Sequence, residues 1–359
     1  MKIGLVGLPK SGKTSLFNLL TGSHVPTSSF GTARGELHTG VAHVPDERVD
    51  RLSALFTPRR TTPASFEVVD LAGFAKGERQ GLEASEFRSA DGLLQVVRAF
   101  TDPAGTAADP ARDVDDLETE LILADLEVVE RRLVRLEASL KKRRTDADAR
   151  EQALLRRLVP VLEAGTPLRA AGLGVEEARA VRGFMFLSLK PILHCLNLSE
   201  KEIDRARTLP EGFGLAAVAA RPHTRVGWVS AVIEAEVAGL AGDEQTAFLA
   251  DLGLPEPAIR RVLRDCYALL GLISFFTVSE DEVRAWSIPR GTRAQDAALA
   301  IHTDIGRGFI RAEVVGYEEL VGAGGSLAAA RERGQLRLEG KDYVVEDGEI
   351  VHVRFNVSR

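Results

Sequence analysis

Apolar residues fall into short runs separated by amphipathic and polar stretches, which is the pattern of an α/β protein. Loops rich in Gly, Ser and Thr at 22–37 and 73–92 are longer than ordinary connections, which indicates functional loops. A helix is expected over 231–240, after the last strand. Strands are expected at residues 3–8, 40–44, 65–71, 93–97, 190–197 and 226–230.

A different period appears after the polar linker at 101–113. Leucine, isoleucine and valine recur at alternating spacings of four and three, as in a coiled-coil seam, at Ile122, Leu126, Val129, Leu133, Leu136 and Leu140. A basic cluster at 141–144 ends this helix, and a second helix carries Leu155, Leu158 and Leu162 on one face. The pattern predicts an inserted helical hairpin. Its seam either packs the two helices together or offers a surface to a partner.

Near Phe276 the pattern of apolar and polar residues changes to one typical of short strands and turns. Strands are expected at 273–278, 285–287, 308–315, 343–345 and 350–355. This predicts a small β-rich C-terminal domain at 276–359. Residues 1–112 and 184–275 would form the α/β domain, and residues 113–183 the helical insertion.

Composition narrows the class of protein. Hydrophobic residues make up 45% and charged residues 27% of the 359 positions, as in globular proteins. No apolar run reaches membrane-span length, and the first strand leaves no room for a signal peptide, so we expect a cytoplasmic protein without membrane contact. Cys195 and Cys266 are too few for a disulfide framework and are expected to be reduced. The formal charge of −6 argues against DNA as a partner, and any RNA contact must use a local basic patch.

The strongest chemical signal is Gly7-x-x-x-x-Gly12-Lys13-Thr14, which lies between the first strand and an amphipathic helix. The glycines let backbone N–H groups surround a phosphate without a Cβ clash. Lys13 supplies charge to the β and γ phosphates, and Thr14 offers its hydroxyl to Mg²⁺. The helix that begins around Ser15 points its positive end at the same phosphates.

A second motif, Asp70-x-x-Gly73, ends an apolar strand as it does in GTPase-type proteins. Asp70 would hold Mg²⁺ through water, and the N–H of Gly73 would meet the γ-phosphate. The alternative is an ordinary strand-to-turn sequence. Thr32, in the loop after the first helix, could give Mg²⁺ its hydroxyl and the γ-phosphate its N–H.

The base-reading position follows the strand at 190–197. GTP-specific proteins carry Asn-Lys-x-Asp there, whereas this chain carries Asn197, Leu198, Ser199 and Glu200. Leu198 replaces the lysine that stacks on the base, and Glu200 is one methylene longer than Asp. These residues are poorly suited to the pair of hydrogen bonds that selects guanine. Without that pair, the site has little to discriminate against ATP. Ser230 and Ala231 would add backbone to the base pocket.

The chain resembles the YchF/Obg-like ATPases, and the resemblance covers nearly its whole length. It is carried, in order, by GLPKSGKTSLFNLLTG, FEVVDLAGFAKG, CLNLSE, EVRAWSI, AIHTDIGRGFIRAEV and LRLEGKDYVVEDGEIVHVRFNV. It implies an ATP-preferring P-loop NTPase with a helical insertion and a ubiquitin-like TGS domain, associated with the ribosome and rRNA. Carried over by motif, Leu198 would contact adenine, Thr14 and Thr32 would hold magnesium, and the phosphates would be bound by Lys10, Ser11, Gly12, Lys13, Thr14 and Ser15.

The chain also departs from the family pattern. Lys10 and Ser11 stand where Asn and Val are usual. The Asn helps hold a potassium ion in potassium-dependent relatives, so the Lys10 ammonium either replaces that ion or only steers anions from solvent. Phe74 occupies the place of the glutamine that orients water in classical GTPases, so hydrolysis is expected to be slow without a partner.

Two functions follow from these residues. One is a magnesium-dependent ATPase, with some activity toward GTP, that acts as a ribosomal switch with Lys13 and Gly73 at the reacting phosphate. The other is a nucleotide-stabilised adaptor or RNA-binding module with little turnover. The intact phosphate motifs favour the hydrolase, and Phe74 favours the adaptor. A C-terminal set of basic residues is either an RNA surface or solvated charge: Arg290, Arg293, His302, Arg307 and Arg311.

Overall fold

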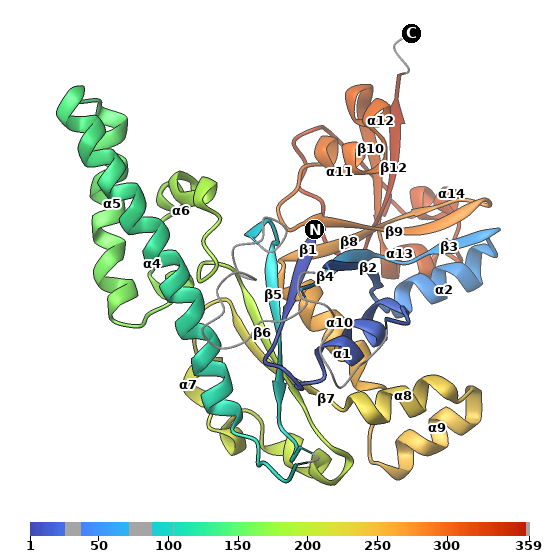
Figure 1. The fold of residues 1–359 in the computed structure, drawn as a ribbon. Coiled ribbons are helices and arrows are strands. Elements are labelled where there is room, and N and C mark those ends of the chain that lie inside the picture. Colours follow the sequence, from blue (N-terminus) through green and yellow to red (C-terminus); the bar gives the residue numbers. More distant parts are fainter. Residues whose placement is uncertain (26–36, 72–87, 103, 357–359) are drawn as a thin grey trace. The chain divides into compact units, whose positions relative to one another are not determined.

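The computed structural model describes residues 1–25, 37–71, 88–102 and 104–356 (Figure 1). The chain forms two compact units, one of residues 1–40 and 67–269 and the other of residues 41–66 and 270–359. Residues 41–66, which the sequence grouped with the N-terminal domain, therefore cluster with the C-terminal residues. No described helix has the length and apolar character that crossing a membrane requires.

The first unit is built on a sheet with the strand order β2-β4-β1-β5-β6-β7. β1 pairs in parallel with β4 and β5, and the parallel pairing continues through β6 to β7. Every residue of β6 is buried, as expected of a strand covered on both faces. The six predicted strands are confirmed, with ends shifted by a few residues: β1 (Lys2–Val6), β2 (Leu37–His43), β4 (Ser65–Leu71), β5 (Gly92–Arg98), β6 (Ile192–Asn197) and β7 (Thr224–Val229).

Helices and short turns of 3₁₀ helix complete this unit. One apolar cluster packs Leu93 of β5 against Leu117 and Leu121, and another joins Leu196 of β6 to Phe213. The predicted helix at 231–240 is confirmed as α8. The elements are α1 (Lys13–Thr21), η2 (Leu168–Ala170), η3 (Arg182–Phe184), η4 (Glu200–Thr208), η5 (Glu211–Phe213), α7 (Ala216–Ala219), α8 (Ala231–Gly239), α9 (Gly242–Asp251) and α10 (Ala258–Leu269).

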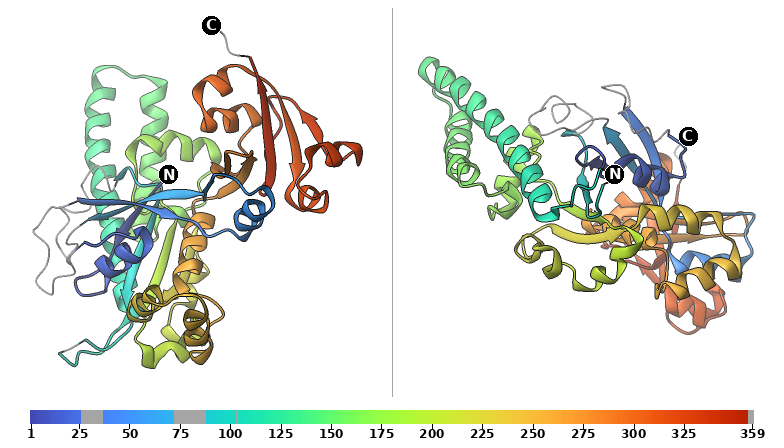
Figure 2. Two further views of the ribbon diagram at one scale, coloured as in Figure 1. Left: turned by 90° about the vertical axis from the view of Figure 1, so that its right-hand side faces the viewer. Right: turned by 60° about the horizontal axis from the view of Figure 1, so that its bottom comes forward.

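The predicted helical hairpin consists of α4 (Pro110–Lys142) and α5 (Asp146–Glu163), with the short α6 (Val175–Val181) beside it. Asp109 and Thr145 cap the two long helices with their side chains. The heptad seam packs the helices against each other, since Val129 and Leu136 share one buried cluster with Leu155. Figures 1 and 2 show the hairpin projecting from the sheet of its unit.

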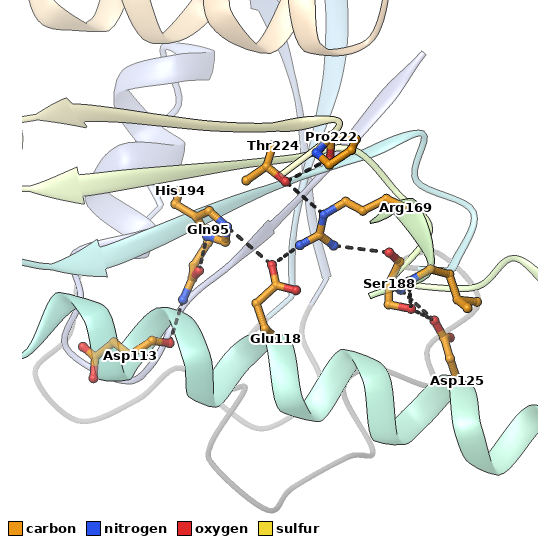
Figure 3. A network of polar contacts seen from close by, with 10 residues as sticks. Gln95, Asp113, Glu118, Asp125, Arg169, Ser188, His194, Pro222 and Thr224 are labelled. Carbon is orange, nitrogen blue, oxygen red and sulfur yellow. Dashed lines mark hydrogen bonds and ion pairs between the residues drawn. The ribbon is translucent and has the colours of Figure 1, made fainter. Parts of the chain in front are cut away.

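A buried polar network joins the base of α4 to the sheet (Figure 3). Glu118 of α4 forms an ion pair with Arg169, which also donates to the hydroxyl of Thr224 at 3.1 Å. His194 of β6 lies 3.4 Å from Glu118 through Nε2. Burial opposes the charge on Glu118, but His194 and Arg169 outweigh it and hold the pKa of this carboxyl below its usual value.

Hydrogen-bond chemistry fixes how His194 is held in this network. Gln95 Nε2 donates to the carbonyl of Asp113 at 3.0 Å, so Gln95 Oε1 must accept from Nδ1 of His194, 2.6 Å away. Burial lowers the pKa of His194. The imidazole therefore ties β6 to β5 through Nδ1, while its Nε2 faces Glu118 of α4.

Asp125, seven residues after Glu118 and on the same side of α4, makes a second anchor. Its carboxylate accepts hydrogen bonds from the N–H groups of Leu187 and Ser188, at 2.8 and 2.7 Å, and from the Ser188 hydroxyl at 2.7 Å. Burial raises the pKa of Asp125 to about 6. The base of the hairpin is thus held to the sheet by polar contacts as well as by apolar packing.

The second unit contains a mixed sheet with the order β11-β10-β12-β8-β9-β3. Neighbouring strands are antiparallel except at β12–β8 and β3–β9. Phe275, Val314 and Val351 lie at the centre of its core. The strands are β3 (Arg60–Thr62), β8 (Leu272–Val278), β9 (Glu282–Pro289), β10 (Phe309–Gly316), β11 (Arg337–Glu339) and β12 (Glu349–Phe355), and the helices are α2 (Glu47–Phe56), α11 (Ala294–Ile301), α12 (Thr303–Arg307), α13 (Tyr317–Gly322) and α14 (Leu327–Glu332).

Four of the five strands predicted for the C-terminal region are confirmed. The strand predicted at 343–345 is wrong, because only Val344 pairs there, in an isolated bridge to Arg293. Tyr343 instead uses its hydroxyl, which donates to Glu349 at 2.5 Å. α2 and β3, which lie in the segment 41–66, were not predicted, and neither was β11.

Candidate nucleotide-binding site

The loop between β1 and α1 is shaped by two glycines. Gly12 precedes α1 in a left-handed conformation (φ 92°), and a Cβ there would lie 2.2 Å from Nδ2 of Asn197. A Cβ on Gly7 would lie 2.7 Å from both Ser11 Oγ and the carbonyl oxygen of Val96. Neither position has room for a side chain, so the backbone itself forms the surface of this loop.

The other loop residues have distinct environments. Lys10 is exposed and also adopts a left-handed conformation (φ 67°). Ser11 is 1% exposed, and its hydroxyl has no hydrogen-bond partner among the described residues. Thr14 and Ser15 lie half-buried in the first turn of α1, where acidic side chains are absent. An anion is favoured at such a helix start.

Lys13 and Asp70, which belong to two different sequence motifs, come together. Parallel pairing of β1 with β4 places Asp70 opposite Leu5, at the edge from which the P-loop leaves the sheet. The ammonium of Lys13 forms an ion pair with this carboxylate, which is 1% exposed. The two motifs therefore form one charged site.

A magnesium ion fits this donor set only with a ligand's help. No cluster of three His, Cys, Asp or Glu side chains that could hold a metal occurs among the described residues. Mg²⁺ commonly takes one or two protein oxygens and completes its shell with phosphates and water. Thr14 and Asp70 are suited to that arrangement. Thr32 and Gly73, the other residues expected at the metal and the γ-phosphate, lie outside the described residues, as does Phe74.

Asn197 connects three segments of the site. Its Nδ2 donates to the carbonyl of Ser11 at 2.9 Å, and its Oδ1 accepts from the N–H of Ala231 at 3.0 Å. The side chain is 5% exposed. The end of β6, the P-loop and the segment that contains Ser230 and Ala231 are thus fixed together. From its place in the sequence, Asn197 was predicted only to contact the base.

The residues after Asn197 differ from the expected base-binding arrangement. Leu198 is 1% exposed and packs with Leu196 and Phe213 in the apolar core, so its side chain does not line an open pocket in this structure. Glu200 is exposed. The carboxylate of Glu202 accepts from the N–H and hydroxyl of Ser199 and caps η4.

Comparison with known proteins agrees with this geometry. A family model described as "50S ribosome-binding GTPase" matches residues 2–132, and the YchF-GTPase_C model, described as a protein of unknown function, matches residues 272–356. The chain is 39% identical over 363 residues to the ribosome-binding ATPase YchF of Bacillus subtilis, with 99% of each chain covered. The chain belongs to the YchF family.

Other relatives are also similar to this chain over nearly its whole length. The YchF-family Obg-like ATPase 1 of Oryza sativa subsp. japonica is 34% identical, covering 100% of this chain and 93% of the relative. The solved structure of the Schizosaccharomyces pombe YchF GTPase matches with a TM-score of 0.84 and 28% identity, covering 99% of this chain and 97% of that one. The resemblance inferred from the motifs is therefore confirmed, and with it the P-loop α/β fold.

Proposed function

We propose that this YchF-family chain is a magnesium-dependent nucleotide hydrolase that prefers ATP to GTP and acts on the ribosome. The observation that carries the proposal is the contact of Lys13 with Asp70 beside a P-loop that excludes side chains. The names of its relatives, which describe ribosome-binding ATPases, support the same activity and partner.

In this proposal the phosphates lie against the P-loop backbone from Lys10 to Ser15, with Lys13 exchanging its ion pair for the β and γ oxygens. Thr14, Asp70 and Thr32 would hold Mg²⁺, which neutralises charge that develops on the phosphates. Gly73 would donate its N–H to the γ-phosphate. Hydrolysis would release Thr32 and Gly73, as in other nucleotide switches.

The proposed preference for ATP rests on what the base-reading segment lacks. Glu202 is engaged as a helix cap and Glu200 is exposed and longer than Asp, so neither supports a two-point contact with guanine. Asn197 is committed to the P-loop and to Ala231. The base would then meet mainly backbone around Leu198, Ser230 and Ala231.

Lys10 is proposed to replace the potassium ion that some relatives require. Its exposed ammonium stands on the P-loop, where it could reach the phosphates. Turnover should then be the same in potassium, sodium and choline salts, whereas Lys10→Ala should lower it. Stimulation of the unmodified protein by potassium would exclude this role.

We also propose the domain boundaries of the sequence analysis, with a TGS domain at 276–359. Residues 41–66 and 270–275 are the exceptions, since they cluster with the C-terminal unit. A second candidate function, the adaptor with little turnover, is supported by Phe74 at the water-orienting position.

Titration calorimetry with Mg²⁺ and either ATP or GTP tests the proposal, together with phosphate release. Wild-type protein should bind ATP more tightly than GTP, and Lys13→Ala should lose binding, whereas Lys201→Ala, an exposed control, should not. Slow phosphate release should rise when ribosomes are added. Binding without release under both conditions would favour the adaptor, and tighter GTP binding would overturn the ATP preference.

A further inference from the structure

The end of the helical hairpin carries four consecutive cations, Lys141 to Arg144, all of them exposed. The two lysines lie in the last turn of α4. Arg143 leaves the helix in an extended conformation (φ −151°, ψ 118°), and Thr145 caps α5. The backbone therefore changes direction within the cationic run, which forms the turn between the two helices.

The tip differs from the shaft of the hairpin in how its charges are paired. Four arginines of the shaft form ion pairs with carboxylates, and Arg135 and Arg150 form none among the described residues. The pairs are Arg131 with Glu127, Arg132 with Glu151, Arg156 with Glu137, and Arg157 with Glu177. In the described part of the chain, no ion pair involves the four tip residues. The helix dipole favours Lys141 and Lys142 at a C-terminus, but it does not account for the arginines that follow.

The hairpin holds these charges away from the sheet of its unit (Figures 1 and 2). Its two helices pack along their own seam, and α4 alone has 33 residues, about 50 Å of helix. The Glu118 and Asp125 anchors fix its base. A rigid arm with a cationic end can reach into a recess of a large anionic partner.

We propose that this tip, residues 141–144, binds the phosphate backbone of structured RNA. The whole chain has a formal charge of −6, so attraction to RNA must be local, and the tip concentrates four positive charges in four residues. Large apolar side chains are not exposed between residues 135 and 174, which argues against insertion into a lipid surface. The choice of RNA rests on the proposed ribosomal function.

The test compares two variants that each remove four positive charges. The tip variant is K141Q/K142Q/R143Q/R144Q. The control, R179Q/R182Q/K201Q/R260Q, removes four exposed cations elsewhere in the same unit. Binding to a fluorescent 20-base-pair RNA hairpin and to purified ribosomes is measured from 50 to 300 mM KCl.

The tip variant should bind the RNA at least tenfold more weakly than wild type at 100 mM KCl. The slope of log K against log salt should fall by about 3, since each lost phosphate contact contributes about 0.7–0.9. The control should keep most of the affinity and slope. Equal loss in both variants would reduce the effect to net charge and overturn the proposal.

A charge-conserving variant, K141R/K142R/R143K/R144K, separates charge from local structure and should bind like wild type. Unfolding temperature and helical circular dichroism should match in all variants. Nucleotide turnover without RNA should also be unchanged. If the protein hydrolyses ATP but binds RNA independently of its tip, the role of the tip is refuted while the proposed hydrolase function stands. Tip-dependent binding to phosphatidylserine vesicles but not to RNA would overturn it in favour of a membrane.

Discussion

Asn197 illustrates how one side chain can organise a binding site. Its amide donates to Ser11 and accepts from Ala231, which are far from each other in sequence. Asn197→Asp keeps the acceptor but places a carboxylate oxygen against the Ser11 carbonyl. We expect a loss of about 1–3 kcal/mol in unfolding free energy and at least tenfold in ATP affinity. Calorimetry and urea denaturation measure both, with the exposed Glu200→Gln as a control that should change neither.

The glycines of the chain offer a matched pair for testing the P-loop. Gly12 and Gly22 flank α1 and both have left-handed backbones, but a Cβ on Gly22 meets no atom within 4 Å. Gly22→Ala should cost about 1 kcal/mol for conformation alone. Gly12→Ala adds the clash with Asn197, so it should cost more and abolish ATP binding. Equal unfolding temperatures for the two variants would contradict this reading of the loop.

At this scale the sequence predicted the phosphate motifs but not all of their contacts. The spacing of Gly7, Gly12 and Lys13 is local, so it could be recognised directly. The tie from Asn197 to Ser11 spans 186 positions and depends on β6 ending beside the P-loop. The burial of Leu198 was also not predictable, because an apolar residue after a strand can face either the core or a ligand.

Among the elements, α4 is anchored by two buried carboxylates, and the contribution of each to stability can be tested. Asp125→Asn leaves one acceptor oxygen for the N–H groups of Leu187 and Ser188, so one of them faces an amide donor. We expect a loss of about 1–3 kcal/mol in stability near pH 4, measured by chemical denaturation. The exposed Asp115→Asn on the same helix is the control and should be close to neutral.

The same carboxyl gives α4 a pH signature. Burial raises the pKa of Asp125 from 3.8 to about 6, so between these values the folded protein keeps a proton that the unfolded chain releases. Its contribution to stability is therefore present below about pH 4 and is lost as pH rises to 6, by at most about 3 kcal/mol. The stability difference between wild type and Asp125→Asn should fall over this range. A difference that stays constant would contradict the raised pKa.

The elements themselves were largely predictable. The heptad spacing predicted the hairpin, and its seam proved to pack the two helices together. What periodicity could not reveal is that Glu118 and Asp125 are buried, because an acidic residue on a long helix is usually solvated. The wrong strand at 343–345 has a similar cause, since its apolar alternation serves an isolated bridge and a tyrosine hydrogen bond.

At the scale of the whole molecule, the reactivity of the two cysteine thiols can be used to test whether the first unit is folded. Cys195 of β6 and Cys266 of α10 are buried, and burial raises the pKa of Cys195 to about 12 and that of Cys266 well above its usual value. Neither should react with a thiol reagent at pH 8 while the unit is folded, and both should react in denaturant. Stopped-flow absorbance measures the rate. Rapid labelling of one thiol in native protein would show local opening at that element.

Family membership was predictable at this scale because motif order survives over the whole chain. The division into units was less so, as residues 41–66 cluster with a region that begins more than 200 positions later. Nothing in the composition of that segment indicates that it packs with the C-terminal unit. Contacts made across such distances become visible only in the folded chain.

The cationic turn of the hairpin also has a consequence for protease digestion. Trypsin cleaves after lysine and arginine, and here four such bonds follow one another in the exposed run from the last turn of α4 to the start of α5. A cut after Arg144 would yield fragments 1–144 and 145–359 that remain associated, because α4 and α5 still share their seam. The nicked protein would then migrate as one species on a sizing column and as two bands after denaturation. Slower appearance of those bands in the presence of a partner would locate the partner at this turn without any substitution in the chain.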